Sequence, residues 1–128
     1  MVEQEGPDRR RPRSVYGAGE EPDARFSMAN ERTALAWVRT ALAFVAGGVG
    51  LTSVARLAGL SRFLDVVAGA LCAVGGLLAV SAVVGWQRRE RAMRLDRPLP
   101  APIALPWLAA AVTVAALLLA GYVLLASR

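Results

Sequence analysis

Three long apolar runs, separated by short polar segments, dominate the hydrophobic pattern of this chain. The runs cover residues 34 to 55, 66 to 86 and 103 to 126, and only Arg39 interrupts the first of them. Each run is long enough to cross a hydrocarbon core of about 30 Å at about 1.5 Å per helical residue. The pattern therefore predicts an all-α integral membrane protein with three transmembrane helices and short connections.

The two connections between the runs are too short to hold a domain of their own. Ser61 is placed to cap the second helix, and Asp65 then falls in the first turn, where the helix dipole favours an anion. We interpret Asp65 as a structural residue. The second connection, residues 88 to 102, holds five Arg residues followed by three Pro residues. The prolines predict an extended, stiff spacer.

The segment before the first run is polar. Residues 1 to 26 are rich in Gly, Pro, Arg and Glu and have almost no apolar side chain to bury. This composition predicts a disordered tail, so we divide the chain into a tail of residues 1 to 26 and a membrane domain of residues 27 to 128. The arginines of residues 9 to 13 favour a topology signal or contact with membrane lipid over a nucleic-acid partner.

Composition supports the membrane assignment and narrows the possible chemistry. Of the 128 residues, 55% are hydrophobic and 20% are charged, and the mean hydropathy is +0.43. A soluble domain of this size would not bury so much apolar surface. The chain has one cysteine, Cys72, and no histidine. The residues required for a His-containing metal site or for Cys–His catalysis are therefore absent. No paired carboxylates lie at membrane depth, and we expect no enzyme activity, metal or cofactor.

The positive charges, all of them arginine, are distributed unequally about the runs. Eleven arginines lie before the first run or in the second connection, against three on the opposite side. Because positively charged segments are retained in the cytoplasm, this count places the amino terminus inside and the carboxyl terminus outside. Trp37, Trp86 and Trp107 all fall at the predicted cytoplasmic end of their runs, as aromatic rings at headgroup level do. We expect a multi-pass protein of the inner (plasma) membrane.

Small residues recur within the runs. Gly69, Ala73 and Gly76 share one face of the second helix, with Gly75 and Ala79 beside them. Such a face permits close helix contact, either within the chain or between subunits. Because three helices alone form a thin bundle, we favour a homo-oligomer.

A basic stripe marks the entry to the first run. Arg25, Arg32 and Arg39 recur every seven residues and share a helix face that continues into small residues. Repeated around an oligomer axis, the stripe would make an electropositive passage for phosphate or another anion. The alternative is that Arg39 reaches back to the headgroups, because helix side chains lean toward the amino-terminal end.

Two other polar residues, Glu31 and Asn30, lie at the entry to the first run, and each can have a purely structural role. Glu31 lies at the same boundary level as Arg88 and Arg89, so it can form an ion pair between the first and second helices, or it can be a solvated residue that stabilises a helix start. Asn30 is interpreted as a helix cap.

These residues form a long motif, which reads Arg25-Phe26, then Ala29-Asn30-Glu31-Arg32-Thr33, then Leu35-Ala36-Trp37 and Arg39-Thr40. The motif resembles the signature of the DUF202 family of small three-span membrane proteins, which includes bacterial YidH-like proteins. The resemblance covers about residues 23 to 126. This chain has Ala34 where the family often has Phe, which changes a local packing contact but not the charges.

The same domain is similar to the membrane part of the eukaryotic vacuolar transporter chaperone complex, which surrounds a polyphosphate-conducting channel. That resemblance implies that Arg32 and Arg39 face a channel and that Glu31 belongs to a charge network at its mouth. It does not extend to a polymerase domain. Two functions are therefore expected as alternatives: a subunit of an oligomeric channel or transporter for phosphate-like anions, or a non-conducting accessory or scaffold protein that binds a larger partner or anionic lipid.

Overall fold

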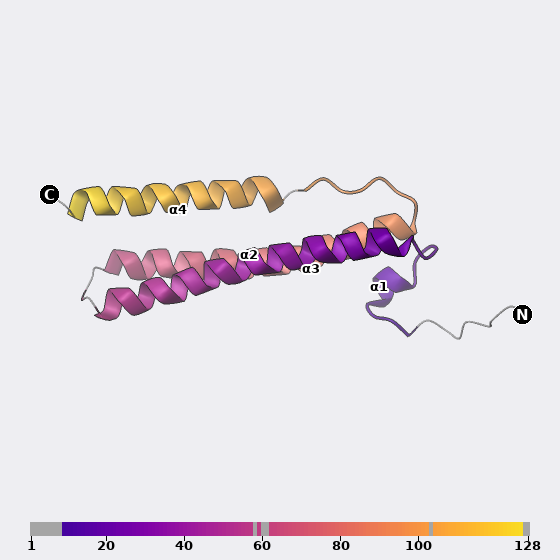
Figure 1. Ribbon diagram of the computed structural model, residues 1–128, viewed down its shortest axis with the longest axis horizontal. Coiled ribbons are helices and arrows are strands. Elements are labelled where there is room, and N and C mark those ends of the chain that lie inside the picture. Colours follow the sequence, from indigo (N-terminus) through magenta and orange to yellow (C-terminus); the bar gives the residue numbers. More distant parts are fainter. Residues whose placement is uncertain (1–8, 58, 60–61, 103, 127–128) are drawn as a thin grey trace, which may run out of the picture.

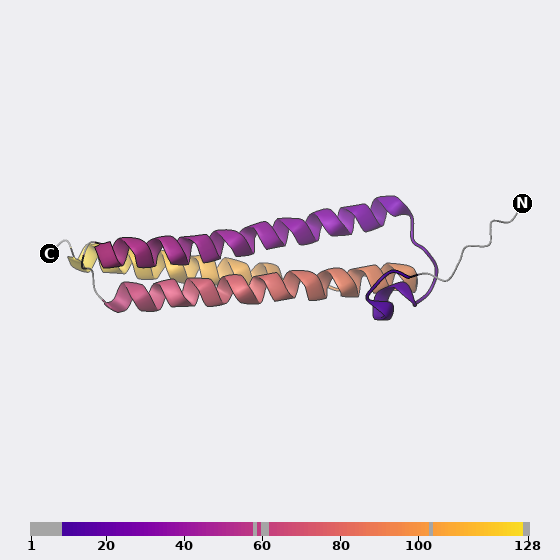
Figure 2. The ribbon, with the colours of Figure 1, turned by 90° about the horizontal axis from the view of Figure 1, so that it is seen from below.

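The residues that the structure describes form four helices, three of them long. The computed structural model describes residues 9–57, 59, 62–102 and 104–126. Helices α2 (Ala24–Leu57) and α3 (Arg62–Arg94) form a long antiparallel pair, and α4 (Ala104–Ala126) runs alongside it (Figure 1). Each of the three is long and apolar enough to cross a membrane. The fold is therefore the predicted all-α, three-span architecture, and the start of α2 and the end of α4 lie at opposite ends of the bundle (Figures 1 and 2).

Helices α2 and α3 are longer than the apolar runs from which they were predicted. With 34 and 33 residues, each extends about 50 Å by helix rise, against about 30 Å of hydrocarbon. The surplus lies mainly at the end that holds the start of α2 and the end of α3, which we call the basic end. The opposite end, where α2 turns into α3, we call the hairpin end.

The prediction of an extended segment from residue 88 was wrong over its first half. Residues 88 to 94 continue α3, since no proline interrupts residues 62 to 97 and both Glu90 and Arg94 are buried. The helix stops with Asp96 in the left-handed region, at a φ of 51°, and the Arg97 N–H donates to the Ala92 carbonyl at 2.9 Å. This is a Schellman-type C-cap, in which an aspartate takes the left-handed position that glycine usually occupies. The acidic first turn of α3 is as predicted, with Asp65 in it, whereas Ser61 lies outside the described residues.

The prediction of a disordered tail also fails over the part that the structure describes. Helix α1 (Arg13–Tyr16) packs against the basic end of α3, and Val15 is 1% exposed there. Gly19 has a φ of +60°, and a Cβ at this position would lie 1.8 Å from the Arg94 carbonyl oxygen. The neighbouring Glu20 N–H donates to that carbonyl at 3.0 Å. The segment therefore supplies a hydrogen-bond donor to a carbonyl at the carboxyl end of α3. The composition of the segment alone did not indicate this contact.

Small residues bring α2 and α3 together. Their buried faces repeat every seven residues, with Ala41, Gly48 and Ala55 on α2 and Ala68, Gly75 and Ala82 on α3. A Cβ on Gly48 would lie 2.7 Å from the Ala68 carbonyl oxygen, and one on Gly75 would lie 2.7 Å from the Ala41 carbonyl oxygen. Glycine is therefore required where the two backbones approach each other.

The predicted small-residue face of α3 is divided by this packing. Gly75 faces α2, whereas Gly69, Ala73 and Gly76 are exposed on the protomer, and a Cβ on Gly69 or Gly76 would meet nothing within 4 Å. Intramolecular packing therefore accounts for Gly75 and leaves the other three residues exposed on the surface of α3.

Helix α4 is held much more loosely. It packs against α3 and not against α2 in the described residues, and none of its membrane-spanning residues is buried inside the protomer. Near the hairpin end, Phe63 of α3 stacks on Tyr122 of α4 with ring centroids 5.5 Å apart.

Candidate functional site

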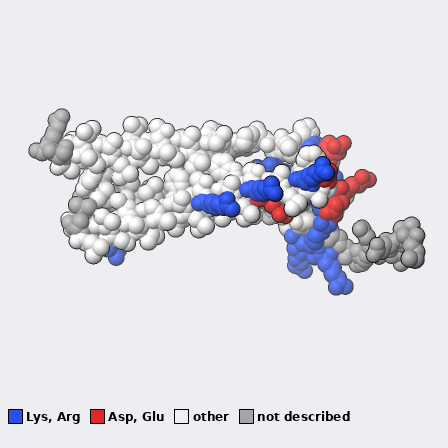
Figure 3. Space-filling view, in the orientation of Figure 1, with Lys and Arg blue, Asp and Glu red and all other residues white. Residues whose placement is uncertain are grey.

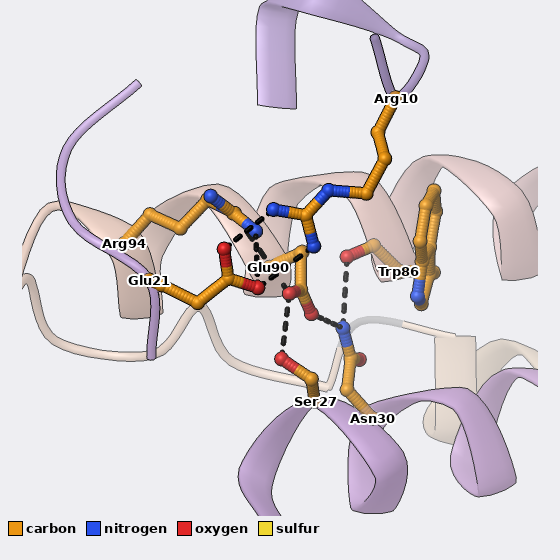
Figure 4. A network of polar contacts seen from close by, with 7 residues as sticks. All are labelled: Arg10, Glu21, Ser27, Asn30, Trp86, Glu90 and Arg94. Carbon is orange, nitrogen blue, oxygen red and sulfur yellow. Dashed lines mark hydrogen bonds and ion pairs between the residues drawn. The ribbon is translucent and has the colours of Figure 1, made fainter. Parts of the chain in front are cut away.

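A buried polar cluster joins α2 and α3 at the basic end. Glu90 of α3 is 3% exposed. From α2, the Ser27 hydroxyl donates to Glu90 Oε1 at 2.7 Å, and the Asn30 amide donates to Glu90 Oε2 at 3.1 Å (Figure 4). Both carboxylate oxygens therefore accept a hydrogen bond from the neighbouring helix, which is the condition for burying a charged group without a large penalty.

Asn30 lies at the centre of this cluster. Its Nδ2 also donates to the Trp86 carbonyl at 3.1 Å, and its Oδ1 accepts a hydrogen bond of 2.8 Å from Arg89 Nε. The amide is thereby fixed in one orientation. Asn30 is inside α2 and buried, so its interpretation as a helix cap was wrong, and its side chain bonds to α3 instead.

Arg94 extends the cluster toward the amino-terminal segment. Its side chain is 3% exposed, lies 3.9 Å from Glu90 Oε1 and contacts Glu21 Oε1 at 3.5 Å. Its guanidinium carbon is 4.8 Å from the centre of the Tyr16 ring. At 3.9 Å the contact with Glu90 is an ion pair rather than a hydrogen bond, and Arg94 Nε has no hydrogen-bond partner within the described part of the chain.

Arg10 closes the cluster from outside. It pairs with Glu21 through two hydrogen bonds of 2.5 and 2.7 Å (Figure 4), and its guanidinium carbon lies 4.8 Å from the centre of the Tyr16 ring. Tyr16 in turn lies against Trp86 at 6.4 Å between ring centroids. The segment containing α1 is therefore attached to α3 by the Arg94–Glu21 ion pair, by the position of Arg94 over the Tyr16 ring and by the Tyr16–Trp86 contact.

The charge network predicted at this level exists, but its acid is Glu90. Glu31 is exposed and makes no ion pair with Arg88 or Arg89 in the described residues. Arg89 does belong to the network, through Asn30. The predicted level of the network was therefore right, but the acid was assigned to the wrong residue. Glu31 follows Asn30 by one residue, so its side chain points about 100° away from the face of α2 that carries Asn30.

A periodic signal for Glu90 was present in the sequence. Asn30 precedes the buried Ala41 by eleven residues, which is three helical turns, and Glu90 follows the buried Ala82 by eight. At about 100° per residue, Asn30 lies within about 20° of Ala41 around α2, and Glu90 lies about 80° from Ala82 around α3, at the edge of the small-residue face. The signal was obscured because Glu90 is surrounded by arginines in the sequence and resembles part of a solvated run.

The basic stripe lies on the opposite side of α2. Arg25, Arg32 and Arg39 are exposed, and a row of basic side chains follows the first half of α2 on the face seen in Figure 3. Each stripe residue is two positions, or about 200°, from the seven-residue positions that face α3. The structure therefore leaves the stripe unused within the protomer, and Arg39 has no ion-pair partner there in the described residues.

The described residues contain no group of three or more His, Cys, Asp or Glu side chains that could hold a metal ion. Cys72 is partly buried against α2, with its Sγ 3.8 Å from the Val45 carbonyl oxygen. The polar cluster thus offers no free carboxylate for acid–base chemistry. Its geometry serves instead to lock α2 to α3 and to orient Arg89.

Comparison with known proteins agrees with the motif and the fold. Residues 25–92 match the model of the family described as a domain of unknown function, DUF202. The chain is 44% identical to the inner membrane protein YidH of Escherichia coli K12 over 108 residues, which is 84% of this chain and 94% of the relative. It is also 42% identical to an uncharacterized protein of Mycobacterium tuberculosis H37Rv over 83 residues, 62% of this chain and 66% of the relative. No solved structure matches the chain.

The match covers α2, most of α3 and thus every residue of the Ser27–Asn30–Glu90 cluster. Together with three apolar helices, it identifies a small multi-pass protein of the inner membrane. The chain belongs to the DUF202 family.

Proposed function

We propose that this protein is a subunit of an oligomeric channel or transporter for phosphate-like anions. In this proposal, the stripe of Arg25, Arg32 and Arg39 faces the axis of a homo-oligomer. The observation that carries the proposal is the outward exposure of this stripe on the face of α2 opposite α3. An exposed arginine within an apolar run is costly in lipid, so a face that carries one is expected to meet protein or water.

The depth of Arg39 defines the alternative to this proposal. Asn30 lies beside Trp86 and Ala41 lies beside Gly75, which fixes the register of α2 against α3. Arg39 is nine residues further into the bundle than Asn30, or about 13 Å by helix rise. Trp37, which we place at headgroup level, is only two residues or about 3 Å before Arg39. Contact of Arg39 with lipid headgroups is therefore the alternative that the flux experiment must exclude.

Exposed small residues supply candidate surfaces for subunit contact. Beyond Arg39, the stripe continues on α2 as Ala43, Ala46 and Gly50, and α3 presents Gly69 and Gly76, all of them exposed. Small residues let helices of neighbouring subunits approach closely in a membrane. A ring built through these faces would place basic side chains at one mouth and a narrow, small-residue passage beyond them.

Anion flux into vesicles reconstituted with the purified protein tests this proposal. Arg39→Glu is expected to suppress flux of phosphate and short polyphosphate, and Arg39→Lys to retain part of it, because only the first reverses the charge. Arg56→Glu is the matched control, since Arg56 is an exposed arginine of the same helix at the hairpin end. The series should be repeated across salt concentrations, because exposed charges are screened beyond about 10 Å near 0.1 M salt.

Wild-type vesicles without anion flux at any salt concentration would rule out conduction. A monomer in native membrane discs, with the same lack of flux, would then favour the alternative, an accessory or scaffold protein. Equal losses in Arg39→Glu and Arg56→Glu would show that the flux does not depend on the stripe.

The proposal also requires a defined orientation, with the basic end in the cytoplasm. Eleven arginines at this end against three at the other support it. A topology reporter fused after residue 128 is expected to be external, and one inserted after Arg97 internal. A cytoplasmic signal from the carboxyl-terminal fusion would contradict the orientation.

A further inference from the structure

A groove opens between α3 and α4, away from the basic stripe. It has a volume of about 490 Å³ and is bordered by α3 and α4, by Trp37 of α2 and by the connection that precedes α4. Its walls are mainly apolar, with Val74, Leu77, Leu108 and Ala111 among them. This volume is in the range of ligand sites in proteins, and the loose packing of α4 leaves it open along the bundle.

Two arginines stand at the head of this groove. Arg88 and Arg89 both line it, and no acidic residue does so in the part of the chain that the structure describes. Arg88 is exposed and has no hydrogen-bond or ion-pair partner within the described residues. Trp37 and Trp107 line the same region, and their rings suit a boundary between hydrocarbon and headgroups.

The polar cluster orients one of these arginines. Arg89 Nε donates to Asn30 Oδ1, which is itself held by Glu90 and Trp86. The two terminal nitrogens lie over Gly85, 3.3 and 3.5 Å from where a Cβ would be, and they have no partner in the described residues. Glycine at this position lets the guanidinium fold back along α3, so that its free donors are fixed beside the groove.

We propose that this groove binds one anionic phospholipid, with its phosphate on Arg88 and Arg89 and an acyl chain along α3 and α4. Oriented guanidinium donors match a phosphate. The lining extends from Arg88 to Val74, fourteen residues along α3, or about 21 Å by helix rise. A free phosphate would leave this long apolar wall without an occupant, whereas an acyl chain fills it.

Lipid binding to the purified full-length protein in detergent tests this proposal by native mass spectrometry. Phosphatidylglycerol is expected to bind about tenfold more tightly than phosphatidylcholine with the same acyl chains, a difference of about 1.4 kcal/mol. Arg88→Gln and Arg89→Gln should each remove most of that preference. Arg91→Gln is the matched control, because Arg91 is an exposed arginine of the same helix that does not line the groove.

A second variant separates the groove from the charges. Ala111→Trp fills the groove without changing a charge and should weaken binding of both lipids. Arg89→Gln removes the hydrogen bond to Asn30 and can therefore change the polar cluster as well as the groove. Arg88→Gln avoids this effect, because Arg88 has no hydrogen bond or ion pair with the cluster in the described residues.

Three results would overturn the proposal: equal binding of the two lipids, equal losses in Arg91→Gln and Arg88→Gln, or unchanged binding in Ala111→Trp. Displacement of the lipid by millimolar inorganic phosphate, without an effect of acyl-chain length, would assign the arginines to a free anion instead. None of these results depends on anion flux, because the groove residues are not part of the stripe on α2.

Discussion

The two interfaces that α3 makes differ in how closely the helices approach. Against α2, glycine and alanine bring the backbones into contact along the membrane span, and the Ser27–Asn30–Glu90 cluster joins the helices beyond it. Against α4, contact is sparse and a groove remains open, although Phe63 stacks on Tyr122 near the hairpin end. Three helices that are all apolar enough to cross a membrane thus form two very different interfaces.

This difference has a physical cause. Lipid is as apolar as leucine, so membrane helices associate through close packing and hydrogen bonds rather than through burial of apolar surface alone. The α2–α3 pair has both of these, which makes it the structural unit of the protein. The α4 helix consists mainly of alanine and leucine, yet none of its membrane-spanning residues is buried inside the protomer. Its surface is left to meet lipid or another subunit.

The largest expected effect is at the buried carboxylate. Glu90→Ala removes the acceptor of Ser27 and Asn30 and leaves Arg94 buried, and it should destabilise the α2–α3 pair by about 3 kcal/mol. Thermal unfolding of the purified protein in detergent measures this effect. Glu31→Ala is the matched control, an exposed acid of the same end, and it should leave the stability unchanged. Equal effects of the two variants would mean that burial of Glu90 does not govern stability.

A smaller loss is expected in the small-residue part of the same interface. Gly48→Leu forces α3 away, because a Cβ there would already lie 2.7 Å from the Ala68 carbonyl oxygen, and the cost should be about 2 kcal/mol. The neighbouring Gly47 has open space around it, so Gly47→Leu is the control. The same unfolding assay compares them, and similar melting temperatures for both variants would contradict the close approach of the helices.

The amino-terminal segment supplies a third contact of α3 and should be weaker. Gly19→Ala introduces a Cβ against the Arg94 carbonyl and should cost about 1 kcal/mol, because both the left-handed conformation and the bond to Glu20 are affected. Faster trypsin cleavage at the arginines of residues 9 to 13 measures release of the segment. Gly59→Ala is the control, because Gly59 also has a positive φ but has open space where a Cβ would lie. This variant should not alter cleavage at the arginines of residues 9 to 13.

The smallest effect is expected at the α3–α4 interface. Phe63→Ala removes the ring stack with Tyr122 and should cost under about 1 kcal/mol, while the α2–α3 pair remains intact. Spin labels on α3 and α4 would report a wider distance distribution in this variant. Phe26→Ala, an exposed phenylalanine on α2, is the control. A loss of stability as large as that of Gly48→Leu would show that α4 is part of the structural unit.

Much of the fold was determined by the sequence alone. Three apolar runs set the number of spans, because every backbone polar group in lipid must be satisfied inside a helix. The motif around Asn30 and Glu31 identified the family. The ends of the helices were less predictable: the arginine-rich residues 88 to 94 resemble a solvated connection, yet they continue α3 because Glu90 and Arg94 are buried against other segments.

Only the tertiary structure decided which faces meet. Helical periodicity placed Asn30 and Glu31 on different faces of α2, but it did not say which of the two faces α3. In a membrane, apolar side chains point toward lipid and toward protein alike, so hydropathy does not mark the buried face as it does in water. The backbone approach at Gly48 and Gly75 sets the register of α2 against α3. That register brings Asn30 to Glu90, and it turns Arg25, Arg32 and Arg39 outward.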